Sequence, residues 1–436
     1  MIQSAELVNL CASYERRSAV VTVAGIPNDH ILVDPDRLKT QVAAIFEHLK
    51  LPVKDAETVA DVLVQADLWG ITTHGVSNYI KGIYVPLLLD KTITSNPTIK
   101  ILSEGSSVAL LDGDGGMGHV ISVYAMELAI EKALKTGIGA VSVTNSTHFG
   151  AAGVYSHMAA EKNMIGISMT NAAPRVVPLY GKNAMLGTNP LSIAAPTNKA
   201  HPFLLDMATS TVSAGKLYVA ALNGGMIPEG WATNVEGQPT SDPVEGLESK
   251  RLLPLGGTKD LGGHKGYGLG IAVDILSGVL SGIGYGNVLP YRHVGHFFCA
   301  VNISKFREID AFKNMMDEMI LELLDTPSSK QGEAVSFPGE IEATTMAERK
   351  RNGMRFEKID TLIVGGGHAG LAMSEHLSNN GVAHLILERE RIVERWRNSR
   401  WDSLVANGPA WHDRFPTMEF SDILPDAFAH RDSVVA

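Results

Sequence analysis

The stretch IGAVSVTNSTHFGAAGVYSHMAAEKNMIGISMT, residues 138–170, decides the fold class of this chain. Residues 138–143 and 165–170 are short, mainly apolar runs bounded by turn-forming residues, which is typical of buried strands. Between them, residues 144–150 form a polar turn and residues 151–163 have a helical pattern. Strands that alternate with helices in this way predict an α/β domain whose sheet is largely buried.

Helical patterns precede this stretch. Asp34 and Pro35 are an N-cap and a first-turn proline, and apolar residues then recur at helical spacing as far as Leu49. A second helix is predicted from about residue 55 to Gly70, and a third over about 120–136, ended by Gly137. Further predictions are strands over 191–196, 202–207 and 296–303, a buried helix over 266–286 and an amphipathic helix at about 307–325.

Length and charge exclude some classes of protein. At about 150 residues per domain, 436 residues suggest about three domain-sized pieces. The chain has 37 Lys plus Arg against 47 Asp plus Glu, a formal net charge of −10. That balance argues against a dedicated nucleic-acid binder, which would need a basic face to neutralise phosphates.

The cysteines and apolar segments bear on the compartment. Only Cys11 and Cys299 are present, so a disulfide framework is excluded and a reducing, cytoplasmic environment is expected. No signal peptide is predicted at the N-terminus. Residues 266–286 are apolar, but Asp274 and many glycines favour a buried helix over a membrane span.

Changes in composition suggest domain boundaries. Residues 326–355 combine a polar, turn-rich run with the charge cluster AERKRNGMR, which indicates a linker. The chain is therefore predicted to consist of an N-terminal extension (1–30), an α/β domain (31–325), the linker (326–355) and a C-terminal piece (356–436).

Two histidines are candidates for acid–base chemistry. His74 follows a helix-ending glycine in a loop, and His148 lies in the turn between a buried strand and a helix. An imidazole can exchange a proton near neutral pH, and ligands of α/β sheets bind beyond the carboxyl ends of strands. The competing interpretations are a merely solvated histidine at 74 and a capping turn at 148.

Two further segments are candidates for cofactor contacts. Asp206 ends a predicted strand, where it could orient an imidazole, bind a cofactor hydroxyl or simply cap a helix. His264 and Lys265 lie in the glycine-rich loop GTKDLGGHKGYGLG, which is either a phosphate-binding loop or a flexible surface loop. No HExxH or CxxC pattern occurs, so no metal site is predicted.

Together these segments resemble the malate/L-lactate dehydrogenase family, which includes ureidoglycolate, sulfolactate and diketogulonate dehydrogenases. The resemblance covers about residues 31–325. It implies a cofactor-binding fold distinct from the standard Rossmann domain, a homodimer, and hydride transfer between NAD or NADP and a small 2-hydroxy or 2-oxo acid. The blocks that carry it are THGVSN (73–78), SVTNSTHFGAAG (142–153), GISMTNAAP (166–174), LGTNPLSIAAP (186–196), LLDMATS (204–210) and GGHKGYGL (262–269).

The resemblance implies roles for individual residues. His148 and His74 match positions with acid–base roles, and His148 is preferred as the base because it follows a strand end. Asp206 matches a position tied to the cofactor or to orienting the histidine. Cofactor contacts are implied for Met207, Ala208, Lys265, Asn171, Ala172 and His264.

The substrate contacts depart from the family pattern. Asn78 stands where an arginine often binds the substrate carboxylate, and Thr73 replaces a common serine while keeping the hydroxyl. Lys81 or Arg175 could supply the missing positive charge, or the substrate differs. The identity of the 2-hydroxy acid and the choice between NAD and NADP therefore stay open.

The C-terminal piece has a separate motif. Gly365, Gly367 and Gly370 follow a predicted strand and open a predicted helix, and Glu388 ends the next strand. This order is typical of a dinucleotide-binding βαβ unit, and it resembles the start of flavin-monooxygenase-like FAD-binding domains. Only about 80 residues follow the linker, against about 100–200 for a complete domain, so a truncated Rossmann-like fragment without stable FAD binding is expected.

Two classes of function remain to be separated. The first is an NAD(P)-dependent 2-hydroxy-acid dehydrogenase that uses a small-molecule substrate, without nucleic acid or membrane partners. The alternative is a catalytically inactive, dimeric binding or assembly protein that carries a truncated flavoprotein tail. The loss of the arginine at Asn78 motivates the alternative, and reduction of a nicotinamide cofactor would distinguish the two.

Overall fold

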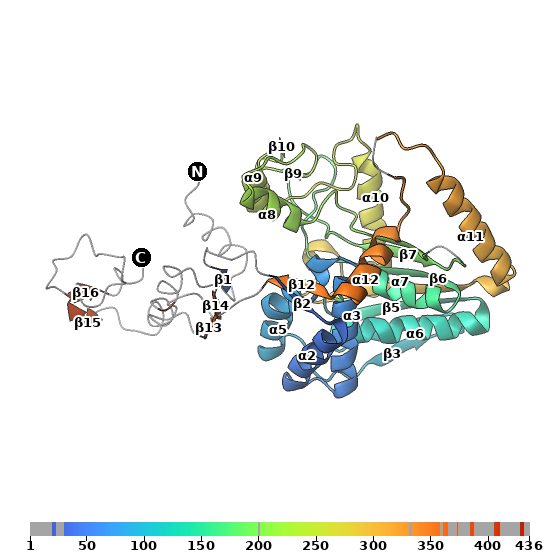
Figure 1. The fold of residues 1–436 in the computed structure, drawn as a ribbon, viewed down its shortest axis with the longest axis horizontal. Coiled ribbons are helices and arrows are strands. Elements are labelled where there is room, and N and C mark those ends of the chain that lie inside the picture. Colours follow the sequence, from blue (N-terminus) through green and yellow to red (C-terminus); the bar gives the residue numbers. More distant parts are fainter. Residues whose placement is uncertain are drawn as a thin grey trace. The chain divides into compact units, whose positions relative to one another are not determined.

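The computed structural model separates the chain into two compact units (Figure 1). One comprises Met1–Val33 with Arg355–Ala436, and the other comprises Asp34–Met354. The structure describes residues 20–22, 30–198, 201–330, 334–357, 361–364, 373, 384–387, 405–409 and 428–430.

A seven-stranded mixed sheet forms the centre of the unit Asp34–Met354, in the order β3-β4-β5-β11-β6-β7-β8. Strands β4 and β5 pair in parallel, and all other neighbours are antiparallel. The strands are β3 (Lys100–Glu104), β4 (Val108–Asp112), β5 (Ile138–Ser146), β6 (Met164–Thr170), β7 (Leu191–Ala195), β8 (Phe203–Met207) and β11 (Val294–Asn302).

The pairing directions bring several chain segments to one edge of this sheet. Because β5 and β6 are both antiparallel to β11, they run in the same direction, and β8 is parallel to them through β7. The carboxyl ends of β4, β5, β6 and β8 therefore lie at the same edge as the amino ends of β7 and β11. We call this edge the site edge.

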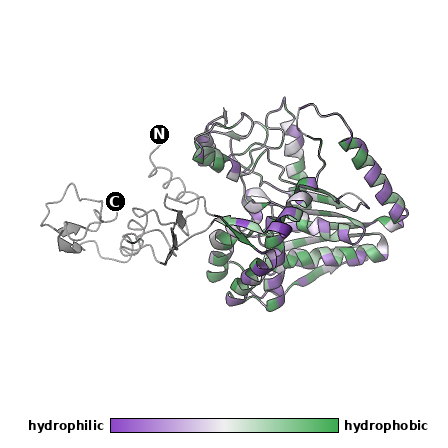
Figure 2. Cartoon of the chain, viewed as in Figure 1, coloured by the Kyte–Doolittle hydropathy of each residue, from purple (hydrophilic) through white to green (hydrophobic). Residues whose placement is uncertain are grey.

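Helices cover the sheet and enclose the core. α6 (Gly118–Thr136) buries Ile121, Ala125 and Ala129, four residues apart, against the sheet. α7 (Ala152–Glu161) adds Tyr155, which packs with Phe298 of β11. Figure 2 shows hydrophobic and hydrophilic residues alternating along these helices. The hydrophobic core therefore lies between the sheet and this helical layer.

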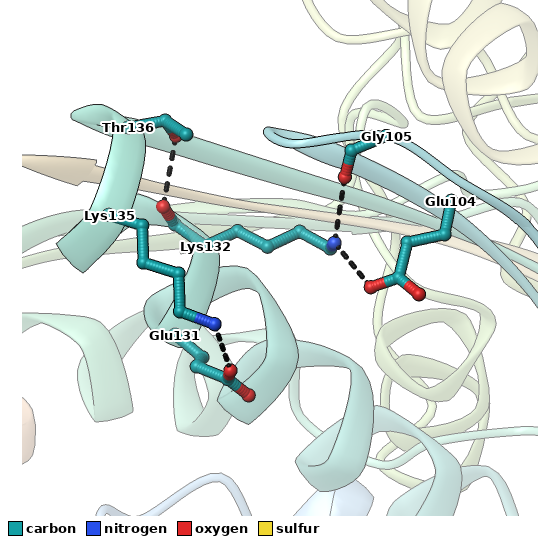
Figure 3. Close-up of polar contacts among 6 residues, drawn as sticks. All are labelled: Glu104, Gly105, Glu131, Lys132, Lys135 and Thr136. Atoms are coloured by element: carbon teal, nitrogen blue, oxygen red, sulfur yellow. Dashed lines mark hydrogen bonds and ion pairs between the residues drawn. The ribbon is translucent and has the colours of Figure 1, made fainter.

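A buried lysine attaches α6 to the turn between β3 and β4 (Figure 3). Lys132 is only 5% exposed, and its Nζ donates to Glu104 Oε1 at 2.7 Å and to the Gly105 carbonyl at 2.9 Å. The nearby Lys135–Glu131 pair on the same helix is exposed at both ends. Exposed ion pairs contribute little to stability, so the hydrogen bonds of Lys132 are the contacts that fix this end of α6.

Several predicted element ends are confirmed. Helix α2 spans Pro35–His48, and Asp34 caps it by accepting from the Arg37 amide at 2.9 Å. Gly137 ends α6 with a φ of 94°, which suits glycine. Strand β5 extends three residues beyond the predicted end because Ser146 pairs with Val294 of β11.

The helix predicted over 266–286 is shorter than expected. α10 spans Gly263–Val273, and the chain then forms the π-helical turn η3 (Asp274–Val279). The turn begins at Asp274, whose carboxylate accepts from the side chains of Asn171 and Asn189. No helix among the described residues is long and apolar enough to cross a membrane.

The remaining elements include the amphipathic helix predicted at about 307–325, which is confirmed as α11, and several elements without a sequence prediction. α12 (Glu340–Asn352) lies within the segment interpreted as a linker and contacts α3 (Val53–Leu68). The other elements of this unit are η1 (Thr72–His74), α4 (Val76–Tyr79), η2 (Ile80–Tyr84), α5 (Val85–Leu89), α8 (Ala214–Leu222), β9 (Ala232–Thr233), β10 (Pro239–Thr240), α9 (Pro243–Ser249), η4 (Gly286–Val288), η5 (Ile303–Lys305) and α11 (Ile309–Leu324).

The second unit contains short paired strands. β13 (Thr361–Val364) pairs in parallel with β14 (His384–Leu387), as a βαβ unit requires, and β1 (Val20–Thr22) pairs antiparallel with β14. β2 (His30–Val33) pairs with β12 (Met354–Glu357), and β15 (Val405–Pro409) pairs with β16 (Phe428–His430). The predicted FAD motif (Gly365, Gly367, Gly370 and Glu388) and nearly all of residues 1–30 lie outside the described residues.

Candidate active site

The site edge collects several of the residues that the sequence singled out. His148 follows the end of β5 by two residues, Asn171 follows β6 directly, and Asp206 lies at the end of β8. The amino end of β11 adds His293, whose Nδ1 lies 2.7 Å from Asn145 Oδ1. Strand direction thus explains why segments far apart in the sequence reach one region.

His148 has a tyrosine partner that the sequence analysis did not identify. The Oη of Tyr84 lies 2.7 Å from His148 Nδ1, and the Gly150 amide donates to the same nitrogen at 3.3 Å. Tyr84 is fully buried at the end of η2, with its ring edge against His119 at 4.9 Å between centroids. The only signal in the sequence was an aromatic residue ten positions after His74.

The second candidate histidine packs directly on the first. The rings of His74 and His148 are stacked, with centroids 5.8 Å apart and planes inclined by 17°. His74 ends the short helix η1, and its Nδ1 lies 3.0 Å from Thr73 Oγ1. The structure therefore brings together both histidines that the sequence proposed.

Burial keeps both imidazoles neutral. It lowers the pKa of His74 to about 4. It also lowers the pKa of His148 well below the usual value, and the neighbouring charges of His74, His119, His296 and Arg292 lower it further. A neutral imidazole has a lone pair that can accept a proton, so either ring can serve as a base at neutral pH.

Two further histidines near this pair, His119 and His296, are fully buried. His296 Nδ1 lies 2.8 Å from Thr170 Oγ1, its Nε2 lies 2.7 Å from Ser146 Oγ, and its ring stacks on Phe149. His119 has no hydrogen-bond partner for either ring nitrogen among the described residues. Their charges lower the pKa of His148, and the sequence analysis identified neither residue.

Asp206 is bonded to the start of α7. Its Oδ2 accepts from the Gly153 amide at 2.7 Å, and a Cβ added to Gly153 would lie 2.9 Å from this oxygen. Burial raises the pKa of Asp206 to about 6, although the Gly153 amide lowers it. The hydrogen bond found for Asp206 is thus to a helix amide and not to a histidine. Met207 and Ala208, both partly buried, follow it.

Asn171 and Ala172 belong to a buried polar network. Asn171 Nδ2 donates to Asp274 Oδ1 at 3.1 Å, and its Oδ1 accepts from the Gly295 amide at 3.0 Å. The Ala172 amide donates to Asn189 Oδ1 at 3.1 Å. The Asn171 side chain is therefore engaged in holding β6 against η3, while Ala172 remains partly exposed at the site edge.

The glycine-rich loop leads into α10 with its polar residues exposed. His264 and Lys265 are both exposed in the first turn of this helix. Gly266 packs so closely that an added Cβ would lie 2.2 Å from the Leu255 carbonyl oxygen. Asn189 Nδ2 donates to the Gly270 carbonyl at 2.9 Å, which joins α10 to the strand β7 segment at the site edge.

Of the four residues proposed to contact the substrate, two have described side chains. Arg175 is partly buried, and its backbone bonds to Leu186 and Leu252. Thr73 is exposed beside His74. The side chains of Asn78 and Lys81 lie outside the described residues, although their backbones belong to α4 and η2. Across the described part of the chain, no cluster of three or more His, Cys, Asp or Glu side chains could hold a metal ion.

The stacked imidazoles of His74 and His148 thus lie at the strand-end edge of a mixed α/β sheet. The sequence profile of the malate/L-lactate dehydrogenase family matches residues 33–361, and the chain belongs to this family. This confirms the resemblance and the mixed α/β fold. The profile of an FAD-binding domain matches residues 358–400, in agreement with the C-terminal motif.

Named relatives cover the same part of the chain. Malate dehydrogenase from Pyrococcus abyssi is 47% identical over 339 residues, which are 76% of this chain and 93% of that protein. L-sulfolactate dehydrogenase from Methanocaldococcus jannaschii is 38% identical, over 75% of this chain and 94% of that protein.

Solved structures agree with the fold. The malate dehydrogenase from Pyrococcus horikoshii superimposes with a TM-score of 0.69 at 40% identity, over 83% of this chain and 99% of that chain. The malate dehydrogenase from Entamoeba histolytica gives a TM-score of 0.71 at 32% identity, over 81% of this chain and 98% of that chain.

Proposed function

We propose that this chain is an NAD(P)-dependent dehydrogenase that interconverts a small 2-hydroxy acid and its 2-oxo acid. The observation that carries the proposal is the neutral His148 ring, bonded to Tyr84 and stacked on His74 at the site edge. The relatives named malate and sulfolactate dehydrogenase support a hydroxy acid as the substrate class.

His148 is the base in this proposal. In the tautomer whose Nδ1–H donates to Tyr84 Oη, Nε2 carries the lone pair that accepts the substrate's hydroxyl proton, and Nδ1 then does not accept from the Gly150 amide 3.3 Å away. In the reverse direction the same nitrogen returns the proton to the carbonyl oxygen. His74 is the alternative base, and its stacking keeps it within the same site.

The residues around α10 fit a phosphate-bearing dinucleotide. Lys265 is exposed in the first turn of α10, where the helix dipole also favours an anion. A Cβ added to Gly268 would meet nothing within 4 Å, so this face of the helix is open. When bound, the nicotinamide ring accepts or donates the hydride at substrate C2. His264, Asp206, Met207, Ala208, Asn171 and Ala172 would complete the cofactor-binding region.

The substrate carboxylate needs a cation. Arg175 and Lys81 are the two candidates, because Asn78 can contribute only an amide. An arginine binds a carboxylate through two parallel hydrogen bonds, whereas a lysine acts as a point charge. Arg175→Lys would therefore raise the KM for the hydroxy acid if Arg175 binds the carboxylate, and Lys81→Met would do so if Lys81 does.

The experiment is a cofactor-reduction assay. The purified protein is incubated with NAD or NADP and each of malate, lactate, sulfolactate and ureidoglycolate, and the absorbance of the reduced nicotinamide is followed. We expect reduction with at least one pair of cofactor and hydroxy acid. Absence of reduction with every pair, in protein that binds the cofactor, would favour the inactive binding or assembly protein.

Two accompanying proposals concern assembly and the C-terminal unit. We expect a cytoplasmic homodimer, which light scattering of the full chain would test. Stable FAD binding is not expected, since the FAD-type match ends at residue 400. A yellow preparation, or uptake of added FAD, would contradict this expectation.

A further inference from the structure

The loop that carries His74 is fixed at its exit by a buried carboxylate. Asp67, near the end of α3, is 2% exposed, and its Oδ2 accepts from the Val76 amide at 2.8 Å. Gly75 lies so close that an added Cβ would be 1.9 Å from Asp67 Oδ1. The carboxylate therefore contacts both residues that directly follow His74.

Helix α12 holds Asp67 from the other side. Arg349 donates from Nη1 to the Asp67 backbone carbonyl, and its positive charge lowers the pKa of the Asp67 carboxyl. Two residues earlier in α3 and three residues earlier in α12, Gln65 Nε2 donates to Met346 Sδ at 3.5 Å. Two contacts thus join α12 to the last turns of α3.

The other end of α12 lies near Asp206. The Leu204 amide of β8 donates to the Pro338 carbonyl at 3.1 Å, just before α12 begins. The negative charge of Glu342, in the first turn of α12, raises the pKa of Asp206. A single helix therefore connects the strand that carries Asp206 with the loop that carries His74.

Burying the Asp67 carboxyl has a cost. Burial raises its pKa to about 6, and the Val76 amide and Arg349 offset only part of this. An apolar side chain of similar size would fill the space without that cost. What it could not provide is an acceptor for the Val76 amide, so the carboxylate serves the conformation of the loop.

We propose that Asp67 is a positioning residue for His74, and that Arg349 of α12 holds Asp67 in the orientation that stacks His74 on His148. Asp67 acts through Gly75 and Val76 and does not touch the substrate. The inference rests on the proposed function only for the chemical role of His74.

The test compares two substitutions at the same position. Asp67→Leu removes the acceptor, whereas Asp67→Asn keeps an oxygen that can accept from the Val76 amide. The first measurement is kcat and KM in the dehydrogenase assay. The second is the rate at which diethyl pyrocarbonate modifies His74, followed by peptide mass spectrometry in protein without substrate.

We expect Asp67→Leu to lower kcat on the order of tenfold, with the KM for the nicotinamide cofactor unchanged, since one buried hydrogen bond is lost. The modification rate of His74 should rise by a similar factor. Asp67→Asn should stay within about threefold of the unsubstituted protein in both measurements. A purely structural role would lower stability in both variants without this difference at His74.

Arg349→Met provides a second variant that leaves Asp67 in place, and Arg351→Met, exposed on the same helix, is its control. We expect faster modification of His74 in Arg349→Met and no change in Arg351→Met. Wild-type reactivity of His74 in Arg349→Met and in folded Asp67→Leu would overturn the proposal. Because the modification needs no turnover, it separates this outcome from a failure of the proposed function.

Discussion

The role of His148 in proton transfer depends on which of its two ring nitrogens is bonded within the protein. Tyr84 and the Gly150 amide both contact Nδ1, so Nε2 is the nitrogen assigned to the substrate. The stacked His74 ring cannot be protonated at the same time without repulsion between two nearby charges. One base and one neutral neighbour is therefore the arrangement that the geometry favours.

Replacing His148 with glutamine should remove the base while keeping a polar side chain. We expect kcat to fall by about two to four orders of magnitude, with cofactor binding retained. The measurements are steady-state turnover and titration of the reduced cofactor by fluorescence. His74→Gln is the matched comparison, and near-normal turnover of His148→Gln with loss of turnover in His74→Gln would transfer the role of base to His74.

Tyr84→Phe should isolate the contribution of the hydroxyl. The ring stays packed against Phe46 and His119, while the hydrogen bond to His148 Nδ1 is lost. We expect kcat to fall by about tenfold, the equivalent of about 1.4 kcal/mol, with little change in KM. Tyr124→Phe, on the exposed face of α6, is the control. Equal turnover in both variants would exclude a role for the hydroxyl.

At the scale of elements, close backbone packing fixes how α6 lies on β5. A Cβ added to Gly139 of β5 would lie 1.9 Å from the Ala129 carbonyl oxygen of α6. Real Cβ atoms do not approach this closely, so the helix and strand would have to separate. The glycine is therefore a packing requirement, although its φ is not in the left-handed region.

Gly139→Ala should consequently destabilise the fold by about 1–3 kcal/mol, as overpacking does. Gly215→Ala in α8 is the control, because its nearest neighbour would be Ser213 Oγ at 3.7 Å. Because Gly215 lies in the first turn of α8, we expect the free energy of unfolding there to rise by at most about 0.5–1 kcal/mol, the difference between alanine and glycine inside a helix. Urea unfolding of both variants measures the difference, and equal midpoints would contradict the packing argument.

The elements that the sequence predicted were those with a local signal. α2 begins at a capping aspartate, and α6 ends at a glycine. Strand β3 is exposed at every position, so it has no hydrophobic alternation, and it forms because it pairs with β4. α12 buries no residue completely, and its charges made the segment resemble a linker.

At the scale of the whole molecule, the buried histidines couple folding to pH. Burial lowers the pKa of His119 and of His296 to about 3, while in the unfolded chain each would titrate near 6.5. The unfolded state therefore binds more protons as the pH falls below 6.5. The contribution of these histidines to the free energy of unfolding is therefore present above pH 6.5. It is lost as the pH falls toward their folded-state pKa of about 3.

His119→Met should reduce this loss. Between pH 7 and pH 5 the unsubstituted protein should lose about 2 kcal/mol more stability than the variant, because one titrating group is removed. Urea unfolding followed by circular dichroism at the two pH values measures the difference. The same slope in His119→Met as in the unsubstituted protein would contradict the assignment.

The sequence by itself determined the α/β class, the dehydrogenase-like blocks and the candidates His74, His148 and Asp206. Each of these is encoded locally, in hydrophobic period, turn residues or short motifs. Only the tertiary structure assigned Tyr84 to His148, Asp67 to the His74 loop and His119 to the interior. The convergence of His148, Asn171 and Asp206 at one edge likewise depends on strand order and direction, because β11 is inserted antiparallel between β5 and β6. A chain's local pattern does not fix which strand becomes whose neighbour, so that step required the folded molecule.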